Sequence, residues 1–408
     1  MGCINRCKPS LRSGSKARAA SPETRSAIAI YTIHDADRES VTRICFVSPW
    51  SYGYFNPEKG FTGGGAQRQI YLLSTALADR FDVHVVVGDY GQPKTEHRDG
   101  VTLHRAYPRQ PRQHIFQPAK HLAVLGDAMR RADADLYIDR NSPRKTAFTY
   151  LLARLLRKRL LYHVANDANL TRRCDALNRP TRALFTRAVR HADARVAQST
   201  HQQELLADGY DSDSTVVPNG YPAVDSVRPA TERDGFLWVG RFNEQHKRPH
   251  LLLELAERLP ESEFTLIGPV DTDNDYQRQV QNRAERLPNV SLLGAVDPRE
   301  IHGHYRTAVA LVSTSAYEGF PNVFLEAWRQ GTPVVSLDVD PGRYGIPDEV
   351  CANGNLDRLE QFLSDLQTDT AYRSRLASNA YELFTAEFEQ STVATKYGDV
   401  IERVLDGQ

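Results

Sequence analysis

The stretch Ser313-Thr-Ser-Ala-Tyr-Glu-Gly-Phe-Pro-Asn-Val-Phe-Leu-Glu-Ala-Trp-Arg-Gln-Gly-Thr-Pro-Val-Val-Ser336 decides the fold. An apolar run just before it, residues 308–312, predicts a buried strand. Pro321 suits the first position of a helix, because the N–H that proline lacks would have no helical partner there. That helix should stop at Gly331 and lead into a second strand at Val334-Val335. The order is therefore strand, loop, helix, strand.

Two carboxylates flank the start of this helix. Glu318 lies in the loop after the first strand, and Glu326 lies eight positions later, off the apolar arc that should face a sheet. The amides of Asn322 and Val323 belong to the helix start between them. Such a site can hold a phosphate on the N–H groups and sugar hydroxyls on the carboxylates.

The Glu318/Glu326 spacing, followed by Gly-Thr-Pro-Val-Val, closely resembles the signature of the retaining glycosyltransferases of family 4. These enzymes have an α/β fold with two facing Rossmann-like domains and parallel sheets, the GT-B class. The resemblance implies that Glu318 contacts the transferred sugar and Glu326 binds the ribose of a nucleotide-diphosphate sugar. It also places Phe320, Pro321, Asn322 and Val323 at this donor. A bare pair of glutamates eight apart arises by chance, so the surrounding motif carries the assignment.

Length and composition fit two domains. The chain has 408 residues and 40% hydrophobic composition, enough to build two cores. The sequence contains no run of about 18 apolar residues, so it predicts no membrane span. The five cysteines are scattered and odd in number, and no secretory pattern follows Met1. We therefore expect a cytoplasmic location.

The zero net charge hides an asymmetry between the two halves. Residues 234–408 hold 16 Lys/Arg and 28 Asp/Glu, a net charge of −12, so residues 1–233 carry +12. A change of sign near the middle is expected where two domains have different partners.

Residues 1–41 predict a disordered basic extension, since they are rich in Arg, Ser and Ala with little periodicity. Met1-Gly2-Cys3 resembles the start of a lipidation motif, but the myristoylation motif has Ser or Thr at position six, where this chain has Arg6. A basic tail or a mis-set start is the preferred interpretation.

The first domain is expected over residues 42–222. A strand at residues 43–48 precedes Thr62-Gly63-Gly64-Gly65-Ala66-Gln67-Arg68-Gln69, which opens a helix. Glycines at such a junction let backbone approach a ligand closely. The segment resembles the Gly-Gly-Ala-Glu-Arg loop of family 4, with Gln67 where Glu is usual, and the family uses it against the donor diphosphate and the acceptor. This implies that Gly64 and Gly65 bind the donor, and a plain packing turn is the alternative.

Further strands are predicted in this domain at residues 83–88, 101–103, 136–139, 160–164 and 194–197, with a helix from about Thr146 to Arg157. His163 stands at the end of one of these strands, where family 4 enzymes often carry a histidine near the donor sugar. It is either a catalytic-site residue or an ordinary loop histidine.

Residues 140–195 form a basic region with 14 Lys/Arg and three acids. A basic amphipathic surface of this kind can contact anionic lipid headgroups. We expect weak membrane-surface contact here, which fits the lipid-linked acceptors of many relatives. A solvated helix face or the phosphates of a soluble acceptor are the alternatives. Nucleic acid is not expected, because interleaved aromatics and a known binding module are absent.

A linker at residues 223–234 should lead to a second domain at 235–385. Arg241 lies just past a strand end and Lys247 six residues later. Family 4 places an Arg and a Lys here, usually five apart, to grip the diphosphate, and a departing diphosphate needs fixed positive charge. Residues 386–408 should form the helix that in the family crosses back to the first domain.

These observations predict a retaining hexosyltransferase that moves a sugar from a nucleotide-diphosphate donor to an acceptor hydroxyl in glycolipid, polysaccharide or glycan assembly. Arg241, Lys247, Glu318 and His163 are the catalytic candidates. We expect no cofactor and no metal, because the five Asp-x-Asp pairs share no common context. The alternatives are a non-catalytic partner subunit, or an epimerase or glycan phosphorylase on the same fold.

Overall fold

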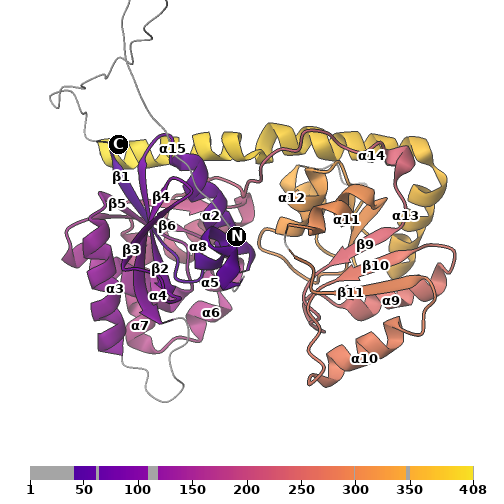
Figure 1. Ribbon diagram of the computed structural model, residues 1–408, viewed down its shortest axis with the longest axis horizontal. Helices are drawn as coiled ribbons and strands as arrows, with labels where there is room; N and C mark the ends of the chain where they lie inside the picture. Colours follow the sequence, from indigo (N-terminus) through magenta and orange to yellow (C-terminus); the bar gives the residue numbers. More distant parts are fainter. Residues whose placement is uncertain (1–40, 61–63, 109–117, 298, 346–349, 408) are drawn as a thin grey trace, which may run out of the picture. The chain divides into compact units, whose positions relative to one another are not determined.

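The computed structural model describes residues 41–60, 64–108, 118–297, 299–345 and 350–407. The expected N-terminal extension therefore lies, except for Val41, outside the described residues, and so do Thr62 and Gly63. The described chain contains two sheets, each with helices packed on it (Figure 1). This is the α/β class with two Rossmann-like lobes that the sequence predicts.

The first sheet has eight strands in the order β3-β4-β2-β1-β5-β6-β7-β8. Neighbouring strands are parallel except for the antiparallel edge pair β3 and β4. The central strands read as apolar runs because both faces of the sheet are covered. The strand bounds are β1 Arg43–Val47, β2 Asp82–Asp89, β3 Thr95–Arg98, β4 Val101–Pro108, β5 Leu136–Asp139, β6 Arg159–His163, β7 Ala194–Ala197 and β8 Thr215–Val216.

The second sheet has five parallel strands in the order β11-β10-β9-β12-β13. Because β9 sits at the centre and β12 is its neighbour, the carboxyl ends of these two strands lie side by side. The strand bounds are β9 Phe236–Val239, β10 Phe264–Ile267, β11 Val290–Gly294, β12 Ala310–Ser313 and β13 Val334–Ser336.

Helices connect these strands in both lobes. Their bounds are α1 Tyr52–Phe55, α2 Gly65–Leu77, α3 Pro118–Ala132, α4 Pro143–Leu155, α5 Asp167–Leu170, α6 Arg172–Asp175, α7 Arg179–Arg190, α8 Thr200–Tyr210, α9 Pro249–Arg258, α10 Asp275–Ala284, α11 Ile301–Thr307, α12 Asn322–Trp328, α13 Leu356–Thr368, α14 Thr370–Leu383 and α15 Gln390–Asp406, with shorter turns η1 Pro57–Lys59, η2 Ala230–Glu232, η3 Pro341–Tyr344 and η4 Phe384–Phe388.

The helix of the deciding stretch is shorter than predicted. Pro321 is the residue before α12 rather than its first residue, and it has an extended backbone. At the other end α12 stops at Trp328, because the amides of Gln330 and Gly331 bond to carbonyls three residues back. Gly331 then takes a positive φ of 61°, which suits glycine. The predicted stop at Gly331 is therefore correct, while the last turn is not α-helical.

Two other helix boundaries also differ from the predicted ones. Helix α4 begins at Pro143 rather than near Thr146, because Ser142 and Pro143 form a standard helix start. The last helix begins at Gln390 rather than 386, and the π-helical turn η4 precedes it.

Helix α15 returns to the first lobe, as predicted (Figure 1). Its apolar side chains, among them Tyr397 and Ile401, are fully buried in one cluster with strands β1 and β2. Arg80 of the first lobe donates hydrogen bonds to Asp399 and Glu402 of α15 at 3.0 and 2.8 Å. The C-terminal helix is therefore part of the core of the N-terminal lobe.

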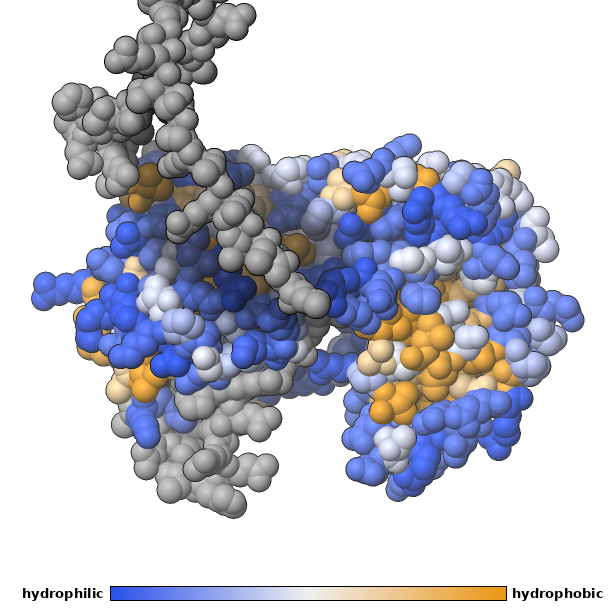
Figure 2. All heavy atoms as spheres, in the orientation of Figure 1, coloured by the Kyte–Doolittle hydropathy of each residue, from blue (hydrophilic) through white to orange (hydrophobic). Residues whose placement is uncertain are grey.

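The visible surface is mostly hydrophilic, with hydrophobic surface near β9, β10 and β11 of the second lobe (Figure 2). Leu293 on the edge strand β11 is 44% exposed. In the described part of the chain, none of the helices combines the length and the apolar character that crossing a membrane requires.

Candidate functional site

The glycine-rich start of α2 meets the start of α12. A Cβ atom at Gly65 would clash with the side chain of Asn322, so glycine is what lets this carboxamide approach. A Cβ atom at Gly64 would lie 3.7 Å from Nη2 of Arg241, a van der Waals contact. The Gly64 amide itself donates to Oε1 of Gln67 at 2.9 Å. The structure thus brings Gly64, Gly65, Arg241 and Asn322 together, two from each lobe.

Lys247 and Glu318 form an ion pair at the carboxyl ends of β9 and β12. Lys247 Nζ bonds to Glu318 Oε1, and His246 Nε2 lies 3.6 Å from the same oxygen. Burial by itself raises the pKa of the Glu318 carboxyl, but His246 and Lys247 more than offset this and lower the pKa to about 2. Glu318 is therefore an anion at neutral pH, able to accept hydrogen bonds but not to donate one.

Arg241 and Lys247 are six residues apart, one more than is usual in family 4, and a turn between them accommodates the additional residue. Oδ1 of Asn243 accepts hydrogen bonds from the amides of Gln245 and His246 at 3.1 and 2.8 Å. This side chain closes the turn before α9. Lys247 consequently reaches Glu318 in spite of its six-residue distance from Arg241.

Glu326 is 6% exposed, and its carboxylate contacts three side chains that are distant in the sequence. Its carboxylate accepts hydrogen bonds from Tyr221 Oη at 3.0 Å and Tyr305 Oη at 2.8 Å, and it forms an ion pair with Arg68. Arg68 comes from α2 of the first lobe, so this pair joins the two lobes. Burial, followed by the Glu326 charge, raises the pKa of both tyrosines well above its usual value, so both remain donors.

Phe320 and Gly319 fix the loop that carries Glu318. The Phe320 ring packs edge-on against Tyr344 and Phe388, with centroids 5.0 and 5.9 Å away. A Cβ atom at Gly319 would lie 3.0 Å from Oδ1 of Asp167 in the first lobe. Glycine therefore lets the loop lie directly against Asp167, a residue that the sequence analysis did not single out.

His163 is buried at the end of β6, apart from the Lys247–Glu318 pair. Its Nδ1 lies 3.3 Å from the hydroxyl of Tyr397 on α15, and its Nε2 has no partner among the described residues. Burial, followed by the charge of Arg140, lowers the His163 pKa well below its usual value, so the imidazole is neutral. A cavity of about 10 Å³, roughly the space of one water molecule, adjoins it.

Arg140 and Asn219 line the same small cavity as His163 and connect the end of β5 to α12. Nη2 of Arg140 donates to Asn219 Oδ1 at 2.6 Å, and Asn219 Nδ2 donates to Asn322 Oδ1 at 2.8 Å. The chain of hydrogen bonds thus runs from the strand ends of the first sheet to the start of α12.

An aromatic stack ties the Glu318 loop to the first lobe. The Tyr317 ring stacks on His246 with centroids 4.4 Å apart, and the Arg172 guanidinium lies over the Tyr317 ring, 4.9 Å from its centroid. Arg172 Nη2 also donates to Tyr317 Oη at 3.0 Å. Tyr317 is 44% exposed, so this contact lies at the surface.

Sequence reasoning missed Arg68, Tyr221, Tyr305, Asp167 and Arg172. Arg68 stands inside the glycine-rich motif and Tyr221 directly follows Pro-Asn-Gly, so their positions gave a signal. Tyr305 and Arg172 stand in no motif, and only the folded chain brings them to the site. Within the described ranges, no group of three or more His, Cys, Asp or Glu side chains could hold a metal ion.

Family comparisons match both lobes. A family described as "Glycosyltransferase Family 4" matches residues 63–223, and one described as "Glycosyl transferases group 1" matches residues 233–369. The chain is 28% identical to glycogen synthase of Mycobacterium tuberculosis over 55% of its own length, and 26% identical to the lipopolysaccharide core glycosyltransferase LpsE of Rhizobium meliloti over 53%. These matches span 58% and 66% of the two relatives.

Solved structures share the fold over nearly the whole chain. Sucrose-phosphate synthase from Thermosynechococcus elongatus matches with a TM-score of 0.72 and 17% identity, covering 90% of this chain and 100% of that one. HepE of Anabaena in complex with UDP and glucose matches with a TM-score of 0.70 and 17% identity, covering 88% of this chain and 99% of that one. Both likenesses show the two-lobed fold.

Proposed function

Because the chain belongs to the family 4 glycosyltransferases of the GT-B class, we propose that it transfers a sugar from a nucleotide-diphosphate donor to an acceptor hydroxyl with retention of configuration. The observation that carries this proposal is the convergence of Gly64, Gly65, Arg241 and the Lys247–Glu318 pair around the start of α12. The complex of the similarly folded HepE with UDP and glucose supports a nucleotide-sugar donor.

In this proposal Arg241 and Lys247 bind the diphosphate. Two close cations stabilise the negative charge that grows on a departing phosphate, and removing one such group typically costs about 10²–10³ in rate. The amides of Asn322 and Val323 in the first turn of α12 can add hydrogen bonds, since they have no partners within the helix. Glycine at 64 keeps side-chain atoms out of the space beside Arg241, and glycine at 65 gives room to the Asn322 carboxamide at the start of α12.

Glu318 is proposed to position the transferred sugar. With its pKa held at about 2, it accepts hydrogen bonds from sugar hydroxyls and does not act as a general acid. The bond between the anomeric carbon and the diphosphate oxygen breaks, and the acceptor oxygen forms the new bond on the same face. The acceptor proton passes to the departing phosphate oxygen, so a separate catalytic base is not needed.

Glu326 and His163 take supporting roles in this scheme. The Glu326 carboxylate has about four acceptor positions, of which Arg68, Tyr221 and Tyr305 occupy three. One position remains to accept from a ribose hydroxyl. His163, which is neutral and buried, is proposed to act near the donor sugar through its partner-poor Nε2.

Donor binding tests the proposal most directly. Isothermal titration with UDP-, GDP- and ADP-sugars should show one donor with a dissociation constant in the micromolar range. Lys247→Met should weaken donor binding by at least tenfold. Lys94→Met, at an exposed position directly before the edge strand β3, should leave donor binding unchanged. Loss of this discrimination between the two variants would refute the donor site.

Turnover distinguishes the alternatives. A transferase releases nucleoside diphosphate and joins the sugar to an acceptor, and NMR of the product should show the anomeric configuration of the donor. Donor binding without any turnover would indicate a non-catalytic subunit. An isomerised nucleotide sugar without diphosphate release would indicate an epimerase.

We also propose weak contact between the first lobe and an anionic membrane surface through α4 and α7. Phe185, Ala188 and Val189 of α7 are buried, while Arg187 on the same helix is exposed. Leu155 at the end of α4 is 70% exposed. An exposed cation and an exposed leucine on two helices that pack together fit the interface of anionic lipids, at about 1 kcal/mol per well-placed cation.

A further inference from the structure

A second cavity opens in the first lobe beside the carboxyl ends of β1 and β5. Its volume is about 510 Å³, within the usual range of small-molecule pockets. The loop after β1 and helices α3, α4 and α6 form its walls. None of the donor residues named above lines it, so this cavity is separate from the Lys247–Glu318 pair.

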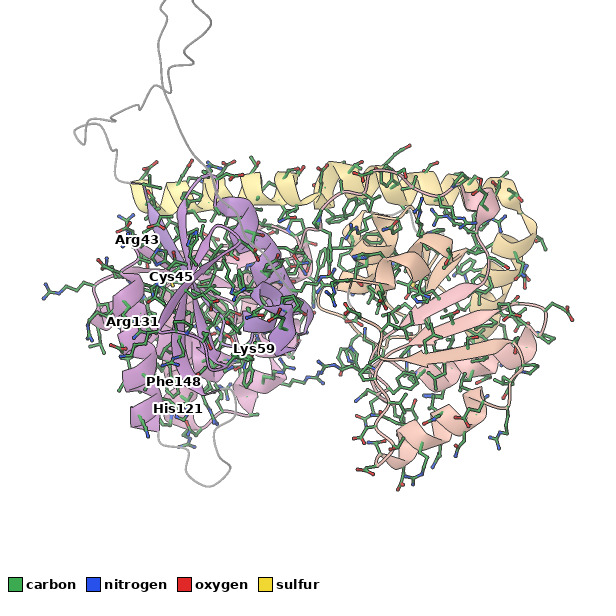
Figure 3. All side chains as sticks on the ribbon, in the orientation of Figure 1. Arg43, Cys45, Lys59, His121, Arg131 and Phe148 are labelled. Carbon is green, nitrogen blue, oxygen red and sulfur yellow. The ribbon has the colours of Figure 1, made fainter. Side chains whose placement is uncertain are left out.

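One wall of the cavity is apolar. Trp50, Leu122, Leu125, Phe148 and Leu177 contribute rings and branched side chains from four different segments. Figure 3 shows Phe148 and His121, another lining residue, near each other at the same end of the lobe. A wall of this composition contacts hydrocarbon or aromatic groups and releases water from them.

The lining of the cavity also includes cations. Lys145, Arg144 and Arg173 line the cavity, together with the start of the 13-residue helix α4. Lys145 Nζ lies 5.0 Å from the centre of the Trp50 ring. Among the residues that the structure describes, no carboxylate forms an ion pair with Lys145. Lys145 therefore lines the cavity without an ion-pair partner in the part of the chain that the structure describes.

Asp139 does not neutralise Lys145, although it lies behind the same helix start. This fully buried carboxylate accepts hydrogen bonds from Thr146 Oγ1 at 2.6 Å, Thr149 Oγ1 at 2.8 Å and Asn141 Nδ2 at 2.9 Å. These bonds fix the start of α4. Burial lowers the pKa of Lys145 to about 8, with Asp139 opposing the shift, so the ammonium is partly desolvated and gains from an anionic occupant.

Helices α5 and α6 lie between the cavity and the loop that carries Glu318. Arg173 Nη1 donates to Asn169 Oδ1 at 3.2 Å, and Asn169 Nδ2 donates to the Asn141 carbonyl at 2.9 Å. Asp167, two residues before Asn169, is the side chain against which Gly319 packs. One short segment thus forms a wall of the cavity on one side and contacts the Glu318 loop on the other.

We propose that this cavity binds the acceptor, and that the acceptor is an anionic amphiphile with a phosphate or carboxylate group beside a hydrocarbon or aromatic group. The anionic group lies at Lys145 and the start of α4, and the apolar group lies against Trp50 and Phe148. Its reactive hydroxyl points past Asn169 toward the Glu318 loop. The identification of this ligand as the acceptor rests on the proposed transferase function, whereas the binding site itself does not.

Trp50 provides a direct measurement of binding. The other two tryptophans, Trp238 and Trp328, are 2% and 1% exposed in the core of the second lobe, whereas Trp50 is half-buried in the cavity wall. We expect octyl phosphate, below its micelle concentration, to change tryptophan fluorescence with a dissociation constant at least tenfold below those of octyl glucoside and inorganic phosphate. Octyl glucoside tests the chain alone, and inorganic phosphate tests the anion alone.

Variants separate this site from adventitious binding. Lys145→Met should weaken octyl phosphate at least fivefold, and the matched surface variant Lys94→Met should not. Trp50→Phe should abolish the fluorescence change. Equal affinity for octyl glucoside, equal affinity for inorganic phosphate, or an unchanged signal in Trp50→Phe would each overturn the proposal.

Donor titration of the same Lys145→Met protein separates the two proposals. Unchanged donor affinity together with loss of octyl phosphate binding supports the acceptor cavity beside a working donor site. Octyl phosphate binding in a protein that binds no nucleotide sugar would refute the transferase function but keep the ligand site. Donor binding without any response to octyl phosphate would refute the cavity proposal alone.

Discussion

Replacing Glu318 by Gln removes one charge from a largely buried ion pair, so the pH dependence of the unfolding free energy tests this pair. The wild-type carboxylate is stabilised by His246 and Lys247, which lower its pKa to about 2 from an ordinary value of 4.5. A group whose pKa is lower in the folded state adds stability above the unfolded pKa. That stability is lost as the pH falls through the folded pKa.

The magnitude follows from these two pKa values. Glu318 has only 12% of its side chain exposed, so solvent screening is limited. The full shift corresponds to about 3 kcal/mol of unfolding free energy. Between pH 5 and pH 3 the wild type should lose about 2 kcal/mol through Glu318 alone. The Glu318→Gln variant lacks this loss because glutamine does not ionise.

Urea unfolding at pH 5, 4 and 3 measures the effect. Other acids contribute equally to both proteins, so the difference between the wild type and Glu318→Gln isolates this carboxyl. Glu244→Gln, an exposed position on the turn before Lys247, is the control and should follow the wild type. Parallel pH profiles for the wild type and Glu318→Gln would refute the Lys247–Glu318 pairing.

Three further changes test other parts of the structure. Gly65→Ala should weaken donor binding about tenfold, equivalent to about 1.4 kcal/mol, because the new Cβ atom displaces the Asn322 carboxamide. Calorimetry measures this, and an unchanged dissociation constant would contradict the close approach of α2 and α12. Arg68→Met should lower the unfolding free energy by about 3 kcal/mol in urea titrations, since it leaves the Glu326 charge buried, and equal stability would show that this charge is solvated. Arg187→Glu changes the charge of α7 by two units, worth about 2 kcal/mol, and should reduce the sedimentation of the protein with anionic vesicles about 30-fold. Its sedimentation with neutral vesicles should not change. Identical sedimentation of the wild type and the variant with anionic vesicles would exclude α7 as the contact.

The charge asymmetry of the chain agrees with this arrangement. The basic half contains the cavity with Lys145 and Arg173, which suits an anionic acceptor. The acidic half contains Arg241 and Lys247, the two cations proposed to bind the donor diphosphate. The net charge of a half therefore does not by itself predict where the proposed donor site lies.

The sequence by itself determined the parts that depend on local spacing. Short runs of mostly apolar residues predicted several strands, as at β1 and β12, because the burial of a strand leaves its pattern in neighbouring positions. Arg241, Lys247, Glu318 and Glu326 stand at fixed distances from strand or helix ends, so their motif could be read from one stretch. The return of the last helix came from family resemblance, and the fold confirms it.

Only the tertiary structure decided which distant side chains meet. Arg68 and Glu326 are 258 positions apart and His163 and Tyr397 are 234 apart, separations at which no local pattern records a contact. Glu326 looked like a ligand-facing residue from its helix position, yet Tyr221, Tyr305 and Arg68 surround it because α11, α12 and α2 converge there. The cavity at Lys145 likewise combines four segments. Side-chain contacts of this kind depend on packing between elements, whereas strands and motifs depend on neighbours along the chain.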